Sequence, residues 1–400
     1  MNIMFLIDSI EGGGAERACL NVASSLCNEH RIWVVSVFKN ADHVPGYYFD
    51  KRLNIIRLDI ENTKKLTSKP GMYFREISSI RKLKKSLKID LSISFLETAN
   101  VLNVLTSCGE KKIISVRNYY SLSLRRERFF FRKIKAIASD TLADTIVTVS
   151  EDCRQDLIAN FAADPRKTKT IYNFYEPRQE ELASNVDTSR FYDRDNALKI
   201  VSMSRFHPQK AQQHLIRAFK EVSVRHPEVK LYIFGKGEEE GYLREVIKKN
   251  DLESAVFLMP FDPASSCYLK KADIYVCTSL YEGFSNSVLE AVNCGVPVIS
   301  TDCHSGPREL LAPETDCSYK TDTIEYAQYG ILIPPFTGDK LTDEPLEKSE
   351  QLLAEALEVL IDDPKLRKSY AHKEKERSSD FSRDKTIIRW QNTIYSTAKS

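Results

Sequence analysis

Residues 272–300 read ADIYVCTSLYEGFSNSVLEAVNCGVPVIS, and this stretch decides the fold of the region around it. The apolar runs at its two ends have the composition of buried strands. Between them, Ser285 is a predicted helix N-cap, and Leu289 and Val292 are spaced to face a core from a short helix. A strand, a helix and a second strand in this order form one unit of a parallel sheet.

Two carboxylates, Glu282 and Glu290, stand near the predicted helix start with seven residues between them. Glu282 falls in the turn before the helix and Glu290 in its second turn. In a parallel sheet this turn lies at the carboxyl edge, where ligands bind, and the N–H groups of a helix start favour phosphate. The alternative is a surface loop with solvated glutamates, which Gly283 and the Cys294-Gly295 helix stop make less favoured. The sequence therefore predicts an anion site flanked by two acids.

Strand patterns alternate with helical patterns in both halves of the chain. The strand patterns are NIMFLID, RIWVVSVF, NIIRL, LSISFL, KIISV and TIVTVS in the first half, and LKIVSMS, KLYIFG, AVFLMP, DIYVCTS, VPVIS and GILIPP in the second. This alternation predicts α/β domains with parallel sheets and helices on both faces. Because 400 residues exceed what one core usually supports, we expect two domains.

The predicted division is a domain over residues 1–175, a polar linker over 176–196, a second domain over 197–378 and a final helix over 379–400. A composition of 42% apolar and 28% charged residues is that of a soluble globular protein. No apolar run approaches the roughly 18 residues of a membrane span, and the first residues lack a signal-peptide pattern, so we expect a cytoplasmic protein. Nine cysteines without a C-x-x-C pair indicate neither zinc nor a disulfide framework.

Four motifs, in this order along the chain, carry a family resemblance. GGGAER at 12–17, SRFHPQKAQQHLIRAF from Ser204, IFGKGEEEGYL from Ile233 and EGFSNSVLEAVNCGVPVIS from Glu282 resemble the Gly-rich loop, the phosphate-binding Arg/Lys motif, a strand-turn-helix and the E-x7-E signature of the retaining family 4 glycosyltransferases. The resemblance implies the GT-B fold, in which two Rossmann-like, doubly wound parallel-sheet domains face a central cleft. It also implies that the final helix, which carries Trp390, returns to the first domain.

For the second domain, the resemblance implies a site for the diphosphate of a nucleotide-sugar. Arg205 and Lys210 match the cations that meet the charge developing on the leaving diphosphate. The alternative for these two residues is an exposed basic turn. Glu290 is expected to bind the ribose hydroxyls, and Glu282 the hydroxyls of the transferred sugar, neither acting as a covalent nucleophile. The family retains the anomeric configuration, usually ascribed to a front-face reaction.

Backbone amides are expected to complete the diphosphate cradle, since small residues permit close approach of the backbone. They are those near Ser285, Asn286 and Ser287, together with the Gly13-Gly14 loop. For the base, the resemblance points to the loop after AVFLMP, with Met259, Pro260 and Phe261, although these are equally well read as residues at the edge of the core.

Many relatives place a His near the transferred sugar, after the strand that corresponds to KIISV. Here the segment reads SVRNYY, so Arg117 or Asn118 fills that place. We expect Arg117 to help bind the sugar or the phosphate. The departure from the family pattern leaves the contacts with the sugar open.

The net charge of +2 hides an asymmetry, because residues 64–135 hold 18 basic and 5 acidic residues. The stretch 124–135, LRRERFFFRKIK, interleaves arginines with three phenylalanines and suits an anionic membrane surface. The alternative is a solvated basic face whose phenylalanines lie in the core. Nucleic acid is not expected, since no recognition motif accompanies the charge.

The predicted activity is transfer of a hexose or N-acetylhexosamine from a nucleotide sugar, with UDP the expected nucleotide. The expected acceptor is a lipid-linked or polysaccharide precursor, as in bacterial capsule, exopolysaccharide or O-antigen synthesis, at the inner face of the plasma membrane. No cofactor or metal is required by the residues, because the only D-x-D sequence, Asp193-Arg194-Asp195, falls in the predicted linker.

Three other functions compete with this prediction. A UDP-sugar epimerase of the same fold and a non-catalytic, membrane-associated scaffold remain as alternatives. A nicotinamide or flavin enzyme is disfavoured, because neither Gly12-Gly13-Gly14 nor the spacing of Gly235, Gly237 and Gly241 matches G-x-G-x-x-G.

Overall fold

A computed structural model of the chain describes residues 1–10, 13–38, 50–60, 70–123, 137, 140–176, 188, 197–262, 264–339 and 345–400. The predicted membrane-binding stretch 124–135 and Asp193-Arg194-Asp195 lie outside these residues, as does the predicted linker 176–196 except for Glu176 and Thr188. The chain forms two compact units, Met1–Glu176 with Arg383–Ser400, and Pro177–Ser382.

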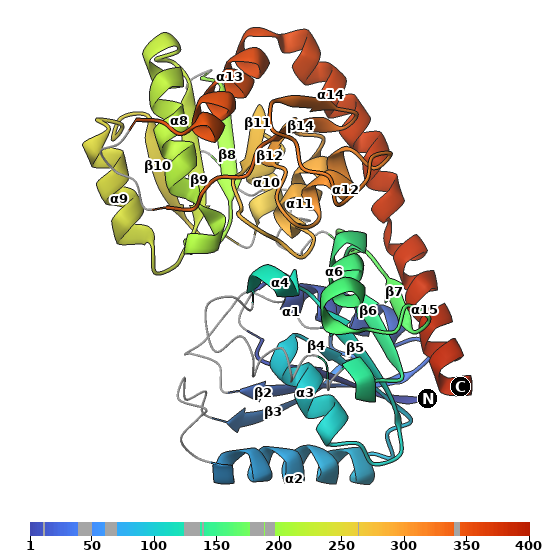
Figure 1. Ribbon diagram of the computed structural model, residues 1–400. Coiled ribbons are helices and arrows are strands. Elements are labelled where there is room, and N and C mark those ends of the chain that lie inside the picture. Colours follow the sequence, from blue (N-terminus) through green and yellow to red (C-terminus); the bar gives the residue numbers. More distant parts are fainter. Residues whose placement is uncertain are drawn as a thin grey trace. The chain divides into compact units, whose positions relative to one another are not determined.

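The first unit is a parallel sheet with the strand order β3-β2-β1-β4-β5-β6-β7 (Figure 1). Its strands are β1 (Asn2–Ile7), β2 (Arg31–Phe38), β3 (Asn54–Ile60), β4 (Leu91–Phe95), β5 (Lys111–Val116), β6 (Thr145–Thr148) and β7 (Thr168–Thr170). Its helices are α1 (Gly14–Leu26), α2 (Pro70–Ser86), α3 (Glu97–Leu105), α4 (Tyr120–Ser123), α6 (Glu151–Phe161) and α15 (Arg383–Lys399). β1 pairs with β2 on one side and with β4 on the other, so the strand order reverses at β1.

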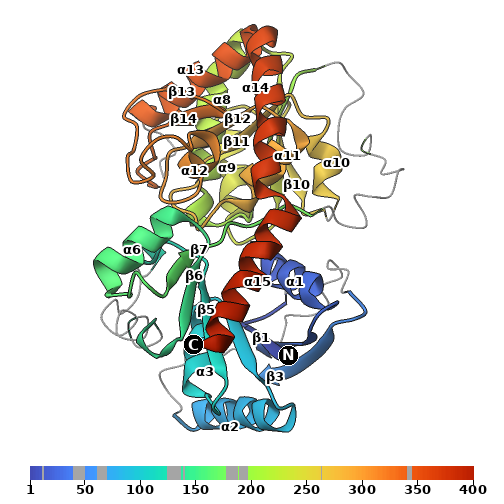
Figure 2. The ribbon, with the colours of Figure 1, turned by 90° about the vertical axis from the view of Figure 1, so that its right-hand side faces the viewer.

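Helices cover both faces of this sheet. Successive side chains of β1 point to opposite faces, so they pack on different helices. Ile3 and Phe5 pack with residues of α1 and α15, whereas Met4 and Leu6 pack with residues of α2 and α3. Figure 2 shows α15 beside α1. Trp390 anchors α15, since it is 2% exposed and stacks on Phe95 with 5.8 Å between the ring centroids.

The second unit is a sheet with the strand order β10-β9-β8-β11-β12-β14-β13, parallel except for β13. Its strands are β8 (Lys199–Met203), β9 (Lys230–Gly235), β10 (Val256–Pro260), β11 (Ile274–Cys277), β12 (Val298–Thr301), β13 (Glu325–Ala327) and β14 (Gly330–Ile333). Its helical segments are η2 (Pro208–Lys210), α8 (Gln212–Arg225), α9 (Glu240–Lys249), α10 (Ser265–Leu269), α11 (Asn286–Cys294), α12 (Pro307–Leu311), α13 (Lys348–Asp362), α14 (Pro364–Ser378) and η3 (Ser379–Phe381).

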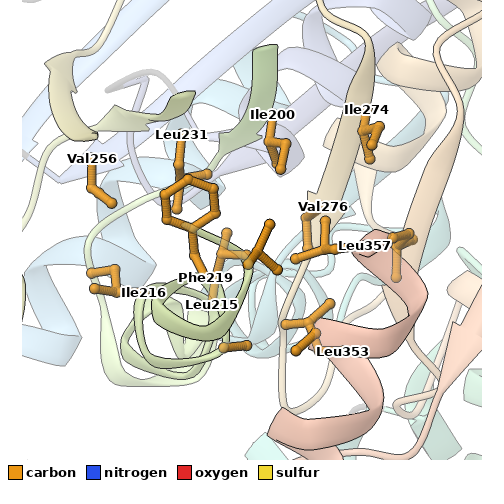
Figure 3. Close-up of a cluster of buried hydrophobic side chains, with 14 of the residues drawn as sticks. Ile200, Leu215, Ile216, Phe219, Leu231, Val256, Ile274, Val276, Leu353 and Leu357 are labelled. Carbon is orange, nitrogen blue, oxygen red and sulfur yellow. The ribbon is translucent and has the colours of Figure 1, made fainter. Parts of the chain in front are cut away.

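One core of the second unit lies between the sheet, α8 and α13, as Figure 3 shows. Ile200 and Ile274 point into it from β8 and β11, and Phe219 and Leu357 point into it from α8 and α13. The strand-helix-strand unit predicted from residues 272–300 is confirmed as β11, α11 and β12, with Ser285 at the N-cap position and Gly295 in the left-handed region (φ 68°) after the helix.

Candidate active site

The site residues predicted in the second unit lie in loops at the carboxyl edge of its sheet. Arg205 and Lys210 follow β8, and Glu282 follows β11. β8 and β11 are neighbours, and the strand order reverses between them. In an open α/β sheet such a reversal is where the two flanking loops run apart and leave room for a ligand.

An ion pair joins the two loops. Lys210 Nζ lies 2.6 Å from Glu282 Oε1, and the two side chains are 14% and 9% exposed. The same carboxylate oxygen accepts a hydrogen bond from Ser279 Oγ at 2.6 Å. The Glu282 carboxylate thus receives two donors on one oxygen, one of them charged, and is held in a fixed orientation.

The ion pair sets the charge state of Lys210. Burial by itself would lower the pKa of this ammonium, but attraction to Glu282 and their hydrogen bond outweigh burial, so the pKa of Lys210 is raised above its ordinary value. Arg205 opposes that increase as a nearby like charge. Lys210 is therefore a cation at physiological pH.

The backbone of the two loops is held together at several points. Thr278 Oγ1 donates to the carbonyl of Lys210 at 2.7 Å, and Leu280 N donates to the carbonyl of Gln209 at 2.9 Å. In return, Gln209 Nε2 donates to the carbonyl of Tyr281 at 2.6 Å. Lys210 and Glu282 are consequently placed by their backbones as well as by their own attraction.

Arg205 presents its side chain to solvent next to this pair. Gln212, the first residue of α8, donates to the Arg205 carbonyl at 2.9 Å and to Ser204 Oγ at 2.7 Å, which fixes the backbone there. Within the described part of the chain the guanidinium takes part in no ion pair closer than 4.0 Å. An exposed guanidinium at this edge is suited to a bidentate contact with an anion.

The start of α11 lies on the other side of Glu282. Ser285 adopts a left-handed conformation (φ 58°) and its side chain makes no capping hydrogen bond; its Oγ lies 3.7 Å from Cys277 Sγ instead. The first N–H groups of a helix have no partner within the helix itself, so a ligand oxygen can take the place of the missing cap. Asn286 and Ser287 are the first two residues of this turn.

Glu290 is mostly buried in the second turn of α11. Tyr275 of β11 connects this helix to β8, because its hydroxyl donates to the carbonyl of Met203 at 3.3 Å and also hydrogen bonds Ser287. Burial raises the pKa of Tyr275 well above its ordinary value, and the neighbouring Cys277 and Glu290 raise it further. This contact fixes the start of α11 relative to the end of β8.

Residues 304–306 close one side of the Glu282 turn. Glu282 N donates to the carbonyl of His304 at 2.5 Å, and Ser305 Oγ donates to the carbonyl of Gly283 at 2.8 Å. Gly306 has φ 99°, and a Cβ placed on it would lie 2.6 Å from backbone atoms of Phe284. Only glycine therefore permits this approach.

The glycines of the β9–α9 turn have a packing role. A Cβ on Gly235 would lie 2.0 Å from the carbonyl oxygen of Ser204, and one on Gly237 would lie 2.2 Å from that of Phe206. This turn therefore packs against the backbone of the Arg205 loop. Phe261, after β10, is 37% exposed, and Lys236 Nζ lies 5.6 Å from its ring centroid.

Arg117, the sugar-binding candidate of the first unit, lies mainly inside that unit. It is 8% exposed, hydrogen bonds Asn173 Oδ1, and stacks over the Phe95 ring at 5.2 Å. Burial lowers the pKa of Arg117 to about 10. Asn118, the alternative residue for that place, is exposed.

Acidic side chains surround the Gly13-Gly14 loop. A Cβ on Gly13 would lie 2.0 Å from Glu16 Oε2, so the Glu16 carboxylate lies at the start of α1. Asp8, after β1, accepts a hydrogen bond from Ala99 N at 2.8 Å. Burial, together with Glu97 and Glu16, raises the pKa of Asp8 to about 7.

Several residues of the site escaped sequence reasoning: Ser279, Thr278, Ser305 and Tyr275. Each acts through hydrogen bonds that the fold sets, and only the position of Thr278 and Ser279 at the end of an apolar run could have indicated two of them. Among the described residues, no helix is long and apolar enough to cross a membrane, and no three His, Cys, Asp or Glu side chains are grouped to hold a metal ion.

Both parts of the chain match known families. Residues 12–179 match the family described as Glycosyltransferase Family 4, and residues 189–325 the one described as Glycosyl transferases group 1. An uncharacterized glycosyltransferase from Methanocaldococcus jannaschii is 32% identical over 353 residues, which are 82% of this chain and 84% of that protein.

A second relative is the N-acetylgalactosamine-N,N'-diacetylbacillosaminyl-diphospho-undecaprenol 4-alpha-N-acetylgalactosaminyltransferase of Campylobacter jejuni. It is 26% identical over 320 residues, 76% of each chain.

Solved structures share the fold over the whole chain. The crystal structure of Anabaena HepE in complex with UDP and glucose has a TM-score of 0.74 at 18% identity, covering 99% of this chain and 100% of that one. Sucrose-phosphate synthase from Thermosynechococcus elongatus has a TM-score of 0.76 at 15% identity, covering 99% of both chains. The chain belongs to the family 4 glycosyltransferases and has the GT-B fold, as its two matched regions, its archaeal relative and its two α/β units show.

Proposed function

We propose that this protein is a metal-independent, retaining glycosyltransferase that moves a hexose or N-acetylhexosamine from a UDP-sugar to a lipid-linked glycan acceptor. The observation that carries the proposal is the Lys210–Glu282 pair, at 2.6 Å, where the strand order of the second unit reverses. A cation, which we assign to the diphosphate, lies there beside a carboxylate, which we assign to the sugar. A donor whose sugar is joined directly to its diphosphate would contact both groups.

The diphosphate leaving group is assigned to Arg205, Lys210 and the start of α11. Both cations and the helix N-terminus already lie at this edge of the sheet before the donor binds, so they are placed to stabilise the charge that develops on the leaving oxygen. In this assignment no divalent cation is needed to meet that charge. Gly13 and Gly14 are a weaker candidate for the cradle, because the Glu16 carboxylate brings negative charge to their loop.

The rest of the donor is assigned around this cradle. Glu290 would accept hydrogen bonds from the ribose, and Phe261, exposed after β10, would stack on the base. UDP is proposed as the nucleotide because HepE, which shares the fold, was crystallised with UDP and glucose. Retention follows from the family, with a front-face reaction in which the departing phosphate helps to remove the acceptor proton.

A lipid-linked acceptor at the cytoplasmic face of the membrane is proposed from two observations. The C. jejuni relative is named for an undecaprenol-diphosphate substrate. In addition, α2 and the turn after it expose Arg81, Lys82, Lys85 and Lys88, which suits an anionic lipid surface. The stretch 124–135, which lies outside the described residues, is proposed for the same role from its sequence alone.

The test measures release of UDP and the sugar product from a panel of UDP-sugars in EDTA, with and without polyprenyl-diphosphate-linked glycans. Acceptor-dependent transfer, lost in Lys210→Ala and Glu282→Ala, supports the proposal. Lys230→Ala and Glu253→Ala are matched controls, because both residues lie away from the carboxyl edge of the sheet. Full transfer by either site variant, or absence of any transfer, contradicts it.

The two alternatives give other results in the same assay. An epimerase would convert a UDP-sugar without an acceptor. A scaffold would bind vesicles of anionic lipid but no UDP.

A further inference from the structure

Ser279 is a buried residue of the candidate site to which the family resemblance gives no role. Its side chain lies between the end of β11 and the Glu282 turn, and it is 2% exposed. Ser279 Oγ donates to Glu282 Oε1 at 2.6 Å, the oxygen that also receives Lys210 Nζ at 2.6 Å. One carboxylate oxygen is therefore held by two donors.

The position of Ser279 is itself fixed. Thr301 Oγ1 donates to the Ser279 carbonyl at 2.6 Å, and Cys277 Sγ lies 3.6 Å from Ser279 Oγ. The first contact ties the residue to the end of the neighbouring strand β12 and the second to the end of β11, so its hydroxyl has little freedom to turn away. Ser279 thus holds Glu282 from the edge of the sheet, whereas Lys210 reaches it from the end of η2.

The second oxygen of the carboxylate has no such restraint. In the described part of the chain, no donor lies within hydrogen-bonding distance of Glu282 Oε2. An ionised carboxylate accepts at both oxygens, so Oε2 retains its capacity to accept a hydrogen bond. Protein donors therefore bind Oε1, whereas Oε2 can accept a hydrogen bond from a ligand.

From this arrangement we infer that Ser279 is a positioning residue, which holds Glu282 so that Oε2 accepts a hydrogen bond from a hydroxyl of the transferred sugar. The inference rests on the proposed function. It also gives Ser279 and Lys210 different roles. A bound diphosphate attracts the Lys210 ammonium away from Glu282, but it exerts no comparable pull on a neutral hydroxyl. Ser279 is then the group that keeps the carboxylate in place while the donor is bound.

Loss of the Ser279 hydroxyl should change only the binding and transfer of the sugar. Ser279 contacts Glu282 and none of the groups assigned to the diphosphate, so the affinity for UDP should not depend on it. A hydrogen bond to a charged group that is lost without replacement lowers affinity or rate by roughly 10- to 100-fold. That loss should appear for the UDP-sugar, and more in kcat than in KM, if the restraint matters most in the transition state.

The experiment measures calorimetric affinities of wild type, Ser279→Ala and Ser279→Cys for UDP and for whichever of UDP-glucose, UDP-galactose, UDP-N-acetylglucosamine and UDP-N-acetylgalactosamine binds the wild type. Transfer kinetics are measured alongside. Cysteine fills the same space but is a weak donor, which separates packing from hydrogen bonding. Ser349→Ala, which removes a buried hydroxyl that bonds only the Pro335 carbonyl among the described residues, is the matched control.

Unchanged affinity for UDP with at least a 10-fold loss for the UDP-sugar or in kcat, in both Ser279 variants, supports the inference. Equal losses for UDP and UDP-sugar, or wild-type behaviour of Ser279→Cys, overturn it, because the residue would then serve packing alone. Failure of the wild type to bind any UDP compound refutes the proposed function. Normal wild-type activity with an unaffected Ser279→Ala refutes only the role of Ser279.

Discussion

Replacing Lys210 by methionine should destabilise the second unit as well as abolish activity. The change keeps most of the side-chain volume but removes the ammonium, so Glu282 keeps its charge with Ser279 as its remaining side-chain donor. Breaking a buried ion pair on one side costs about 3–5 kcal/mol, and the low end applies here because both side chains retain some exposure.

The predicted loss in the free energy of unfolding is therefore about 3 kcal/mol. In a unit of this size it corresponds to a decrease in Tm of roughly 6–12 °C. Thermal unfolding followed by circular dichroism measures it. The double variant Lys210→Met/Glu282→Gln removes both charges and should recover most of the loss, because no buried charge is left without a partner.

The pH dependence of the stabilisation that this ion pair supplies follows from the raised pKa of Lys210. A lysine whose pKa is higher in the folded state stabilises that state fully below its unfolded value, and the stabilisation is lost as pH rises through the folded value. The difference in unfolding free energy between wild type and the double variant should thus be constant from pH 6 to 9 and change only above about 10.5. A Lys210→Met protein that melts within 1 °C of wild type, or a double variant no more stable than the single one, would refute the reasoning.

Three further changes test other parts of the structure. Gly306→Ala should lower Tm and UDP affinity, because φ is 99° there and the new Cβ would lie 2.6 Å from the backbone of Phe284. Gly241→Ala should be neutral or slightly stabilising, because nothing lies within 4 Å of its Cβ. Equal Tm values for the two variants would contradict this. Trp390→Ala should cost about 3–5 kcal/mol in the unfolding of the first unit, measured by urea denaturation, and a cost below 1 kcal/mol would show that α15 is not held by this ring. Burial raises the pKa of Glu374 well above its ordinary value of 4.5, so the contribution of this group to stability should fall as pH rises above about 4.5. The stability of Glu374→Gln relative to wild type should therefore rise between pH 5 and 8, and parallel pH profiles would count against it.

The fold could be read from the sequence wherever strands were long and apolar. RIWVVSVF became β2 with the same bounds, and residues 272–300 gave β11, α11 and β12. The short strands β7 and β13 were missed, because three residues carry too little pattern to stand out from a loop. That β13 runs antiparallel likewise depends on tertiary pairing with β14.

The site was only partly readable. Lys210 and Glu282 carry charge in a recognisable motif, and the structure brings them to 2.6 Å. Ser279 could not be found, since a serine after a strand is common and its target is set by the fold. Arg117 was assigned from the place of a His in the resembled family, and the fold buries it against Phe95 and Asn173, so its contact with the sugar or the phosphate stays a prediction.

The most direct test of the central claim is a calorimetric titration of UDP into the protein in EDTA, repeated with Arg205→Ala/Lys210→Ala. Wild-type binding without added metal, weakened at least 100-fold in the double variant, is the result expected if these two cations hold the diphosphate. Wild-type affinity in the double variant, or binding of UDP that requires a divalent metal, would contradict the claim.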